Sequence, residues 1–307
     1  MKETAHVLSA SRRTDIPAFY LDWFMDHIDK EQFPVTNPYT RQTRWITVHP
    51  DRFHTLVFWS KDFGPFLRSK AGETLIKKGF NLFFNFTVNS ESPALEPAVP
   101  ALPRRLEQMR QLTDRFDPRA VVWRFDPICF YKTAPQRGTE DNFSDFSTIA
   151  DVAGSRSIKK CVTSFFDTYA KINRRLTFLN RRDDAKTVFI QPDMSKKVTI
   201  IKKMEQRLAA NNMRLSLCCE KEIFSRLGPD SGVSQNACID GNYLKSIYNG
   251  NPVTQRDYGQ RSKMGCQCTR SVDIGSYDRH PCHHNCLFCY ANPEIDKSVK
   301  ADKNQCR

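Results

Sequence analysis

The sequence predicts an α/β protein built as a complete or partial (β/α) barrel of the TIM type. Short runs of apolar, β-branched or aromatic residues recur along the 307 residues, and amphipathic stretches separate them. Such alternation is typical of a parallel sheet covered by helices. The number of units, and the absence of a nucleotide-binding glycine fingerprint, favour a barrel over a doubly wound sheet.

The predicted strands cover residues 7–10, 55–60, 82–88, 120–126, 161–166, 215–219 and 272–275. Two shorter runs, at 45–48 and 188–190, are weaker candidates. The predicted helices cover residues 18–30, 66–78, 104–115, 143–152 and 198–211. In the last of these Ile200, Ile201, Met204 and Leu208 recur at helical spacing, which indicates a surface helix with one apolar face against a sheet.

These elements fit one domain over residues 1–290, with a cysteine-rich loop at 276–290, a turn-rich insertion at about 228–263, and a polar C-terminal tail at 291–307. A hydrophobic fraction of 39% and 22 Phe are enough for a core and exclude a globally disordered chain. No internal repeat or low-complexity tract interrupts this organisation.

The 47 Lys and Arg residues exceed the 34 Asp and Glu residues, and the resulting charge of +13 would attract anionic partners such as nucleic acid or phosphorylated metabolites. Alternatively, the charge is spread over solvated helix faces, since no nucleic-acid motif is present. Residues 1–20 lack the apolar core of a secretory signal, and no run of about 18 apolar residues occurs. We therefore expect a soluble, cytoplasmic protein without a membrane partner.

Polar residues gather after the predicted strands. They are Ser11, Arg12, Asp15, Lys61, Arg124, Asp126, Asp167 and Glu220. In a barrel of parallel strands this rim carries the chemistry, although ordinary loops also begin with polar residues. Arg12, Arg13, Arg124 and Asp126 could hold an anionic substrate or SAM, because a guanidinium binds a carboxylate or phosphate in a bidentate manner. The alternative is a structural Arg–Asp pair within the barrel mouth.

Five of the 11 cysteines fall between Cys266 and Cys289. In a reducing cytosol such numbers indicate metal binding or catalysis rather than disulfides. Cys282, Cys286 and Cys289 follow a C-x3-C-x2-C pattern, which can direct three thiolates at one metal centre. A structural zinc site normally closes with a fourth Cys or His, and an iron–sulfur cubane usually has four Cys. A cubane held by three Cys has one iron open to another ligand.

Residues 282–290 resemble the radical S-adenosylmethionine (SAM) signature, C-x3-C-x-φ-C, with Phe288 at the aromatic position. The resemblance implies that Cys282, Cys286 and Cys289 bind three irons of a [4Fe–4S] cluster and that SAM chelates the fourth. Phe288 would pack beside the cluster. In that family one electron, from a donor such as flavodoxin or ferredoxin, cleaves SAM to methionine and a 5′-deoxyadenosyl radical, which abstracts a substrate hydrogen.

The family carries this motif after its first barrel strand, whereas here it lies near the C-terminus. A permuted radical SAM-type barrel explains the difference: strand 271–275 leads into the cysteine loop and pairs with strand 7–10. Ser11, Arg12 and Asp15 would then lie where the family binds the methionine part of SAM. The family's glycine-rich SAM contact is not visible in this region.

The whole chain also resembles the DUF1848 family of bacterial proteins. The segments that carry the resemblance are 9–17, 57–61, 123–128, 238–240 and 273–275, the last leading into the cysteine loop. This resemblance implies no reaction, so the functional expectation rests on the cysteines.

The remaining cysteines form a second group. Cys266 and Cys268 lie just before the last predicted strand, and Cys218, Cys219 and Cys238 follow or flank the predicted strand at 215–219. We expect Cys219, Cys238, Cys266 and Cys268 to bind an auxiliary [4Fe–4S] cluster; a zinc site and unligated buried thiols are the alternatives. Successive strand residues point to opposite faces, so only one of Cys218 and Cys219 should reach this centre. The isolated Cys129 and Cys161 are expected in the core.

His280, His283 and His284 surround the first cysteine of the motif, and one of them could complete a Cys3His zinc site. Such a site would leave the spacing and Phe288 unexplained, so we expect solvated loop histidines. The leading function is a radical SAM-like enzyme acting on a small-molecule or nucleic-acid substrate, for which an anionic group would suit the charge. The alternative is a non-enzymatic iron–sulfur or zinc protein that binds nucleic acid.

Overall fold

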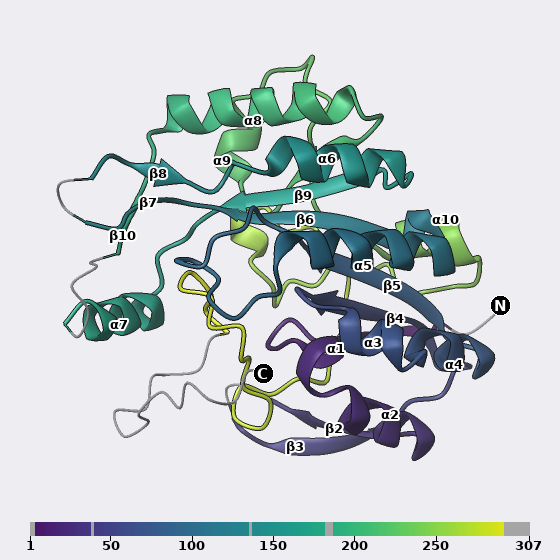
Figure 1. Cartoon of the computed structure of the whole chain (residues 1–307). Coiled ribbons are helices and arrows are strands. Elements are labelled where there is room, and N and C mark those ends of the chain that lie inside the picture. The colour runs from purple at the N-terminus through teal and green to yellow at the C-terminus, as the bar shows by residue number, and fades with distance from the viewer. Residues whose placement is uncertain (1–3, 38–39, 135–136, 182–186, 292–307) are drawn as a thin grey trace.

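An eight-stranded parallel sheet forms the centre of the computed structural model, which describes residues 4–37, 40–134, 137–181 and 187–291 (Figure 1). The strand order is β12-β11-β9-β6-β5-β4-β1-β13. The strands are β1 (His6–Ala10), β4 (Phe53–Ser60), β5 (Asn81–Thr87), β6 (Val121–Ile128), β9 (Lys160–Phe165), β11 (Arg214–Leu217), β12 (Ser234–Gln235) and β13 (Val272–Asp273). The predicted α/β class with a large parallel sheet is confirmed.

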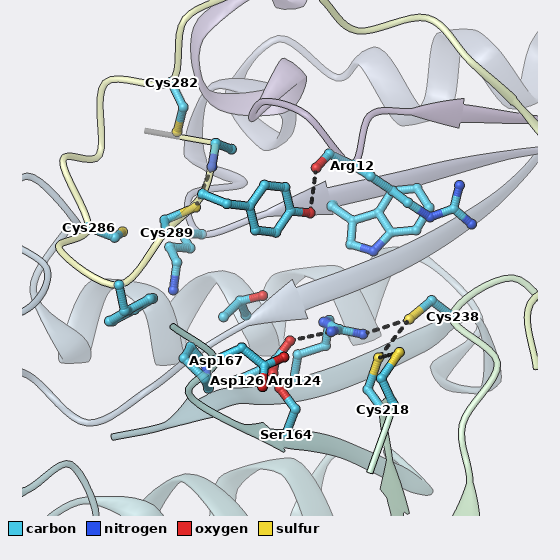
Figure 2. Close-up of a pocket in the computed structure, with 18 of the residues that line it drawn as sticks. Arg12, Arg124, Asp126, Ser164, Asp167, Cys218, Cys238, Cys282, Cys286 and Cys289 are labelled. Atoms are coloured by element: carbon cyan, nitrogen blue, oxygen red, sulfur yellow. Dashed lines mark hydrogen bonds and ion pairs between the residues drawn. The ribbon is translucent and has the colours of Figure 1, made fainter. Parts of the chain in front are cut away.

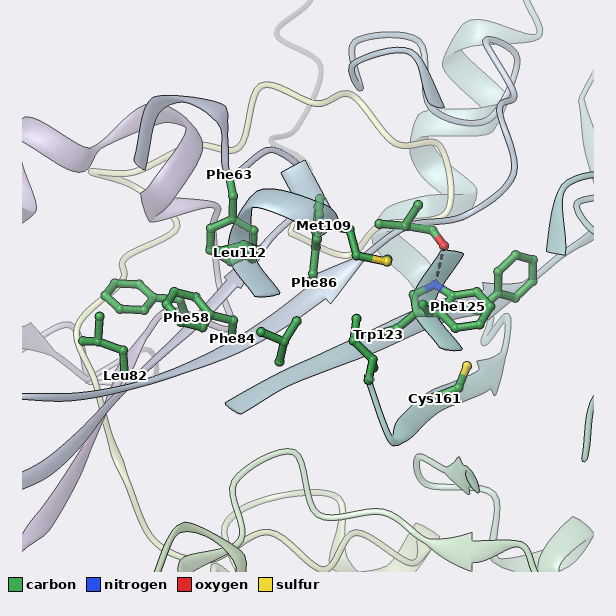
Figure 3. Close-up of a cluster of buried hydrophobic side chains, with 14 of the residues drawn as sticks. Phe58, Phe63, Leu82, Phe84, Phe86, Met109, Leu112, Trp123, Phe125 and Cys161 are labelled. Carbon is green, nitrogen blue, oxygen red and sulfur yellow. Dashed lines mark hydrogen bonds between the residues drawn. The ribbon is translucent and has the colours of Figure 1, made fainter. Parts of the chain in front are cut away.

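One face of the sheet packs against helices. In β5, Leu82, Phe84 and Phe86 alternate with Phe83 and Asn85, so that every second side chain enters the main apolar core (Figure 3). The covering helices are α1 (Ile16–Phe19), α2 (Leu21–Asp29), α3 (Gly64–Arg68), α4 (Ala71–Lys77), α5 (Leu102–Arg115), α6 (Phe146–Ser155) and α8 (Met194–Ala209). Trp123, fully buried here, donates its indole N–H to the Val88 carbonyl at 2.8 Å.

The other face of the sheet packs against the segment predicted as a turn-rich insertion. Val57, Phe83 and Val122 contact a second apolar cluster that includes Leu244 of α10 (Gly241–Tyr248). A Cβ atom at Gly241 would lie 2.1 Å from the Val253 carbonyl oxygen, so this close approach requires glycine. The segment therefore covers the face of the sheet opposite the main core.

The weaker strand candidates belong to two small antiparallel sheets. Residues 45–48 overlap β3 (Thr43–Thr47), which pairs with β2 (Gln32–Thr36) in one small sheet. Residues 188–190 form β10 (Val188–Ile190), which belongs to the other small sheet. There β7 (Phe130–Lys132) pairs with β10 on one side and with β8 (Glu140–Asp141) on the other. The helices α7 (Ala170–Leu179) and α9 (Lys221–Phe224) were not predicted. In α7 basic and amide residues interrupt the apolar spacing that begins at Ile172, and α9 is too short, at four residues, for a helical period to be recognised.

The predicted pairing of the C-terminal strand with the N-terminal strand is confirmed. Leu8 pairs with Val272 and Ser9 with Asp273 in parallel register. Cys306 and the tail at 292–307 lie outside the described residues. In the described part of the chain, no helix is long and apolar enough to cross a membrane.

Candidate functional site

A cavity of about 280 Å³ lies at the C-terminal ends of the parallel strands. Figure 2 shows Cys282, Cys286 and Cys289 on one side of it and Cys218 and Cys238 on the other. The predicted rim residues that line the cavity are Ser11, Arg12, Asp15, Lys61, Arg124, Asp126 and Asp167. Glu220 is not among the lining residues, and its carboxylate accepts a hydrogen bond from the Phe165 backbone N–H at 2.7 Å.

The start of the cysteine loop is fastened to the N-terminal strand. The Asp273 carboxylate accepts hydrogen bonds from Ser9 Oγ at 2.8 Å, Ser11 Oγ at 2.6 Å and the Arg12 backbone N–H at 2.9 Å. Gly275 follows at once, and a Cβ atom there would lie 2.0 Å from Ser11 Oγ. The chain therefore enters the cysteine loop against the turn that follows β1.

Asp15 holds the middle of the cysteine loop. Its buried carboxylate accepts hydrogen bonds from the Ser60 hydroxyl, from the Lys61 backbone N–H at 2.8 Å, and from His284 Nε2 at 2.8 Å when that nitrogen is protonated. Asp15 and Cys282 line the same cavity, as the predicted pairing requires. Burial raises the pKa of Cys282 to about 12, and the nearby Cys289 and Asp15 contribute to the shift.

The expectation of solvated histidines is wrong for two of the three. His284 is 2% exposed, its ring lies 4.7 Å from that of Phe19, and its two nitrogens contact Asp15 and the Ala98 carbonyl. His280 is also buried, against Trp23 at 4.3 Å between ring centroids. Aromatic residues of α1 and α2 cover this part of the loop, which the loop's own sequence does not reveal. His284 consequently has no ring nitrogen left for a zinc ion.

A buried arginine that sequence reasoning missed holds the last part of the cysteine loop. Arg175 of α7 is 5% exposed, and its Nη2 donates to the carbonyls of Cys286 at 3.3 Å, Leu287 at 2.5 Å and Cys289 at 3.0 Å. Within the described residues its Nε and Nη1 have no hydrogen-bond partner. Burial lowers the pKa of Arg175, and Cys289 and Cys286 oppose that shift. In the sequence, Arg175 follows Ile172 by three residues and precedes Leu176, so helical spacing places it on the apolar face of α7. That spacing is the signal that could have indicated its burial.

A second buried cation lies beneath the loop. Lys61 forms an ion pair with Glu96, and its Nζ lies 5.3 Å from the centroid of the Phe288 ring. Burial alone would lower the pKa of Lys61, but Glu96 and Cys286 outweigh it and the pKa is raised. Phe288 packs in a small apolar cluster with Cys286, and is therefore part of the loop's anchor.

The second group of cysteines is assembled on the opposite side of the cavity. Cys218 Sγ lies 3.9 Å from Cys219 Sγ and 3.9 Å from Cys238 Sγ, and the Cys238 backbone N–H donates to Cys268 Sγ at 3.2 Å. Cys266 interacts with the side chains of Cys219 and Cys268. The four cysteines predicted to act together are thus brought together.

The expectation that Cys218 and Cys219 point to opposite faces is wrong. The strand β11 ends at Leu217, and Cys219 adopts a left-handed backbone conformation with φ of +62°. This turn brings both sulfurs to the same side. Among the described residues, no group of three or more His, Cys, Asp and Glu side chains stands ready to hold a single metal ion.

Two arginines, Arg12 and Arg124, line the same cavity, and Figure 2 shows Arg124 beside Cys238. The Arg12 guanidinium lies over the Trp59 ring, 5.0 Å from its centroid, and its buried Nη2 has no hydrogen-bond partner among the described residues. Arg124 forms the ion pair with Asp126 that the sequence suggested, and its Nη1 also donates to Cys238 Sγ at 3.1 Å. The wall of the cavity therefore carries a paired charge at Arg124 and Asp126 and a further cation at Arg12.

Comparison with known proteins identifies a protein family for this chain. A family model described as "Domain of unknown function (DUF1848)" matches residues 7–291. Among solved structures, a xylose isomerase domain protein from Planctomyces limnophilus is 12% identical, with a TM-score of 0.25. The match covers 73% of this chain and 66% of that chain, slightly less than two thirds of its length. A likeness at that level supports no inference about activity. No curated protein matches the chain.

Proposed function

The chain belongs to the DUF1848 family, and we propose that it is a radical SAM-like iron–sulfur enzyme acting on a substrate bound in the cavity. One observation carries the proposal. The C-x3-C-x2-C loop leaves β13 at the C-terminal edge of a parallel sheet, where Cys282, Cys286 and Cys289 line a cavity of about 280 Å³. Small-molecule sites begin at about 300 Å³, so the space is of the right order for a nucleoside-sized molecule.

The residues of the loop fit a cluster with three protein ligands. The cavity wall offers three thiols from the loop, and His284, the loop histidine that also lines the cavity, has both ring nitrogens engaged by Asp15 and the Ala98 carbonyl. Thiolate ligands would bring negative charge to this buried position, and the buried Arg175 and Lys61 supply positive charge beside it. A guanidinium with two unsatisfied N–H groups is costly without such a partner.

The bound cluster and SAM would supply one-electron cleavage of SAM and hydrogen abstraction from the substrate. The protein's own residues would hold and orient these groups. Asp15 and Ser11 are occupied by protein donors and acceptors, so they act by positioning the loop. Arg12, with an unsatisfied Nη2 on the cavity wall, is the candidate to bind a carboxylate of SAM or of the substrate.

The proposal also makes the sheet a permuted radical SAM-type barrel. The strand before the cysteine loop would be the first strand of that barrel, and β1 would be the second. The sheet order, which runs from β13 through β1, β4, β5, β6, β9 and β11 to β12, supports this reading. Closure between β12 and β13 is part of the proposal.

Anaerobic reconstitution tests the function. We expect brown protein with acid-labile sulfide, an electron paramagnetic resonance signal that changes when SAM is added, and release of methionine and 5′-deoxyadenosine under reduction. Cys282→Ala, Cys286→Ala and Cys289→Ala should each abolish the SAM-dependent change, whereas Cys161→Ala, in the main core, should not. Stoichiometric zinc without sulfide in protein prepared without oxygen would refute the proposal. Iron–sulfur protein that binds nucleic acid but never cleaves SAM would favour the non-enzymatic alternative.

A further inference from the structure

Five cysteines that interact with one another, called the cysteine ring below, line the side of the cavity opposite the cysteine loop. Cys218 contacts Cys219 and Cys238, each at 3.9 Å between sulfurs. Cys219 interacts with Cys266, Cys266 with Cys268, and Cys268 with Cys238. The sulfurs come from three segments: the end of β11, the segment after β12, and the approach to β13. Distant parts of the chain thus converge on one centre.

The surroundings of the ring suit thiolates bound to iron. Cys238 Sγ accepts hydrogen bonds from Arg124 Nη1 at 3.1 Å and Asn236 Nδ2 at 3.2 Å, and Cys268 Sγ accepts one from the Cys238 backbone at 3.2 Å. Hydrogen bonds to cysteine sulfur are a means by which proteins tune iron–sulfur clusters. The buried Arg12 Nη2, also on the cavity wall, has no partner among the described residues. Arg124 also pairs with Asp126, so the observations that favour thiolates here are the hydrogen bonds to Cys238 and Cys268 and the unpartnered Arg12 Nη2.

Cys219 is held in an uncommon conformation that serves the ring. A non-glycine residue at φ of +62° is strained, and such strain concentrates at functional sites. The conformation turns the Cys219 sulfur away from the path of the strand and into contact with Cys266. Cys218, one residue earlier, directly follows β11, and its backbone N–H donates to the Thr163 carbonyl at 2.8 Å.

We propose that the ring is a second metal site, which takes a [4Fe–4S] cluster through Cys219, Cys238, Cys266 and Cys268. Four thiolates leave no iron open, so this cluster would not bind SAM. Cys218 is then the fifth sulfur, packed against the ligands without a bond to iron. Both cysteine groups line the same cavity, so a substrate bound there would lie between two clusters. The proposal does not depend on SAM chemistry at the first site.

The experiment counts iron, sulfide and zinc per folded chain after anaerobic reconstitution. Wild-type protein and Cys218→Ser should each contain about eight iron atoms, the content of two cubanes. The triple variant Cys282/286/289→Ala should retain about four, with a signal that SAM does not alter. Cys268→Ser should also retain about four, but with the SAM-sensitive signal intact. Cys161→Ala, which removes a buried thiol from the main core, is the matched control and should resemble wild type.

Several outcomes would overturn the second site. A folded triple variant without iron shows that the ring binds no cluster, and zinc without additional sulfide shows that the ring is a zinc site. Loss of iron from Cys218→Ser with retention in Cys219→Ser refutes the ligand set. Circular dichroism and gel filtration show whether Cys268→Ser folds. If it does not fold, the test of the second site rests on the iron content of the wild-type protein and of the triple variant. Eight iron atoms without SAM cleavage would refute the proposed function and leave this site standing.

Discussion

Replacing Arg175 by Gln should loosen the first cluster while leaving the metal-free fold almost unchanged. The guanidinium is buried, and two of its nitrogens lack partners in the described part of the chain. The cost of burying that charge offsets the hydrogen bonds that it donates to the loop. With thiolates bound to iron beside it, the same charge becomes favourable. Arg175 is therefore a positioning residue whose effect depends on the cluster.

The magnitude follows from the geometry. The three carbonyls of Cys286, Leu287 and Cys289 share the one nitrogen, Nη2, so their hydrogen bonds count as about one strong charged interaction rather than three. Such an interaction contributes about 1.5–3 kcal/mol, which corresponds to a change of about 10- to 150-fold in the equilibrium for iron release.

The assay is the release of iron to a chelator at increasing concentration, followed by absorbance, together with urea unfolding of the metal-free protein. Arg174→Gln, an exposed residue on the same helix, gives the same change of net charge and should behave as wild type. An Arg175→Gln variant that releases iron as wild type does would contradict the reasoning. Equal destabilisation of the metal-free and loaded forms would make Arg175 an ordinary structural residue.

Three further predictions concern the frame of the site. Asp15→Asn should destabilise folding by about 1–3 kcal/mol in urea titrations, because an amide leaves one of its buried donors unpaired, and should weaken SAM binding while iron is retained. Gly275→Ala should cost about 1–3 kcal/mol, because the new methyl group displaces the Ser11 hydroxyl, whereas Gly138→Ala, with open space around it, should be close to neutral. Burial lowers the pKa of His54, so the folded protein binds fewer protons than the unfolded chain. Stability should therefore fall as the pH drops below about 6.5, and His54→Gln should flatten that dependence of the urea midpoint.

The parallel sheet could be predicted because its strands are buried on both faces. The run in β5 has apolar residues at 82, 83, 84 and 86, and such a short, nearly continuous apolar run is typical of a strand in a parallel sheet that is covered on both faces. The pairing of β13 with β1 could be predicted for a different reason. A cysteine loop at the C-terminal ends of the strands must directly follow a strand of the sheet. In this sequence the predicted strand at 271–275 is the one that comes shortly before Cys282.

The missing parts of the site depend on tertiary contacts. The strand pattern around residue 218 extends through Cys219, and nothing local indicates that the chain turns left-handed at that residue. The local sequence predicts that His284 is a solvated loop residue, because the residue that buries it, Phe19, is far away in sequence. Arg175 lies in a helix with four basic or amide residues, so its burial is determined by the loop that it binds rather than by its own segment.

The position of the motif at the end of the chain ties the site to completion of the fold. Ser9 and Ser11 bind Asp273 across 264 and 262 residues of sequence, and the cysteine loop begins directly after that contact. The entropy of closing a loop grows only with the logarithm of its length, so this long connection costs little more than a loop of half the size. The cysteine ring likewise joins the end of β11 to the approach to β13, two strands that lie near opposite ends of the strand order. Both groups of thiols are therefore complete only when the last strand docks beside the first. On the proposed function, metal binding would then depend on the completed sheet and not on the cysteine-rich segment alone.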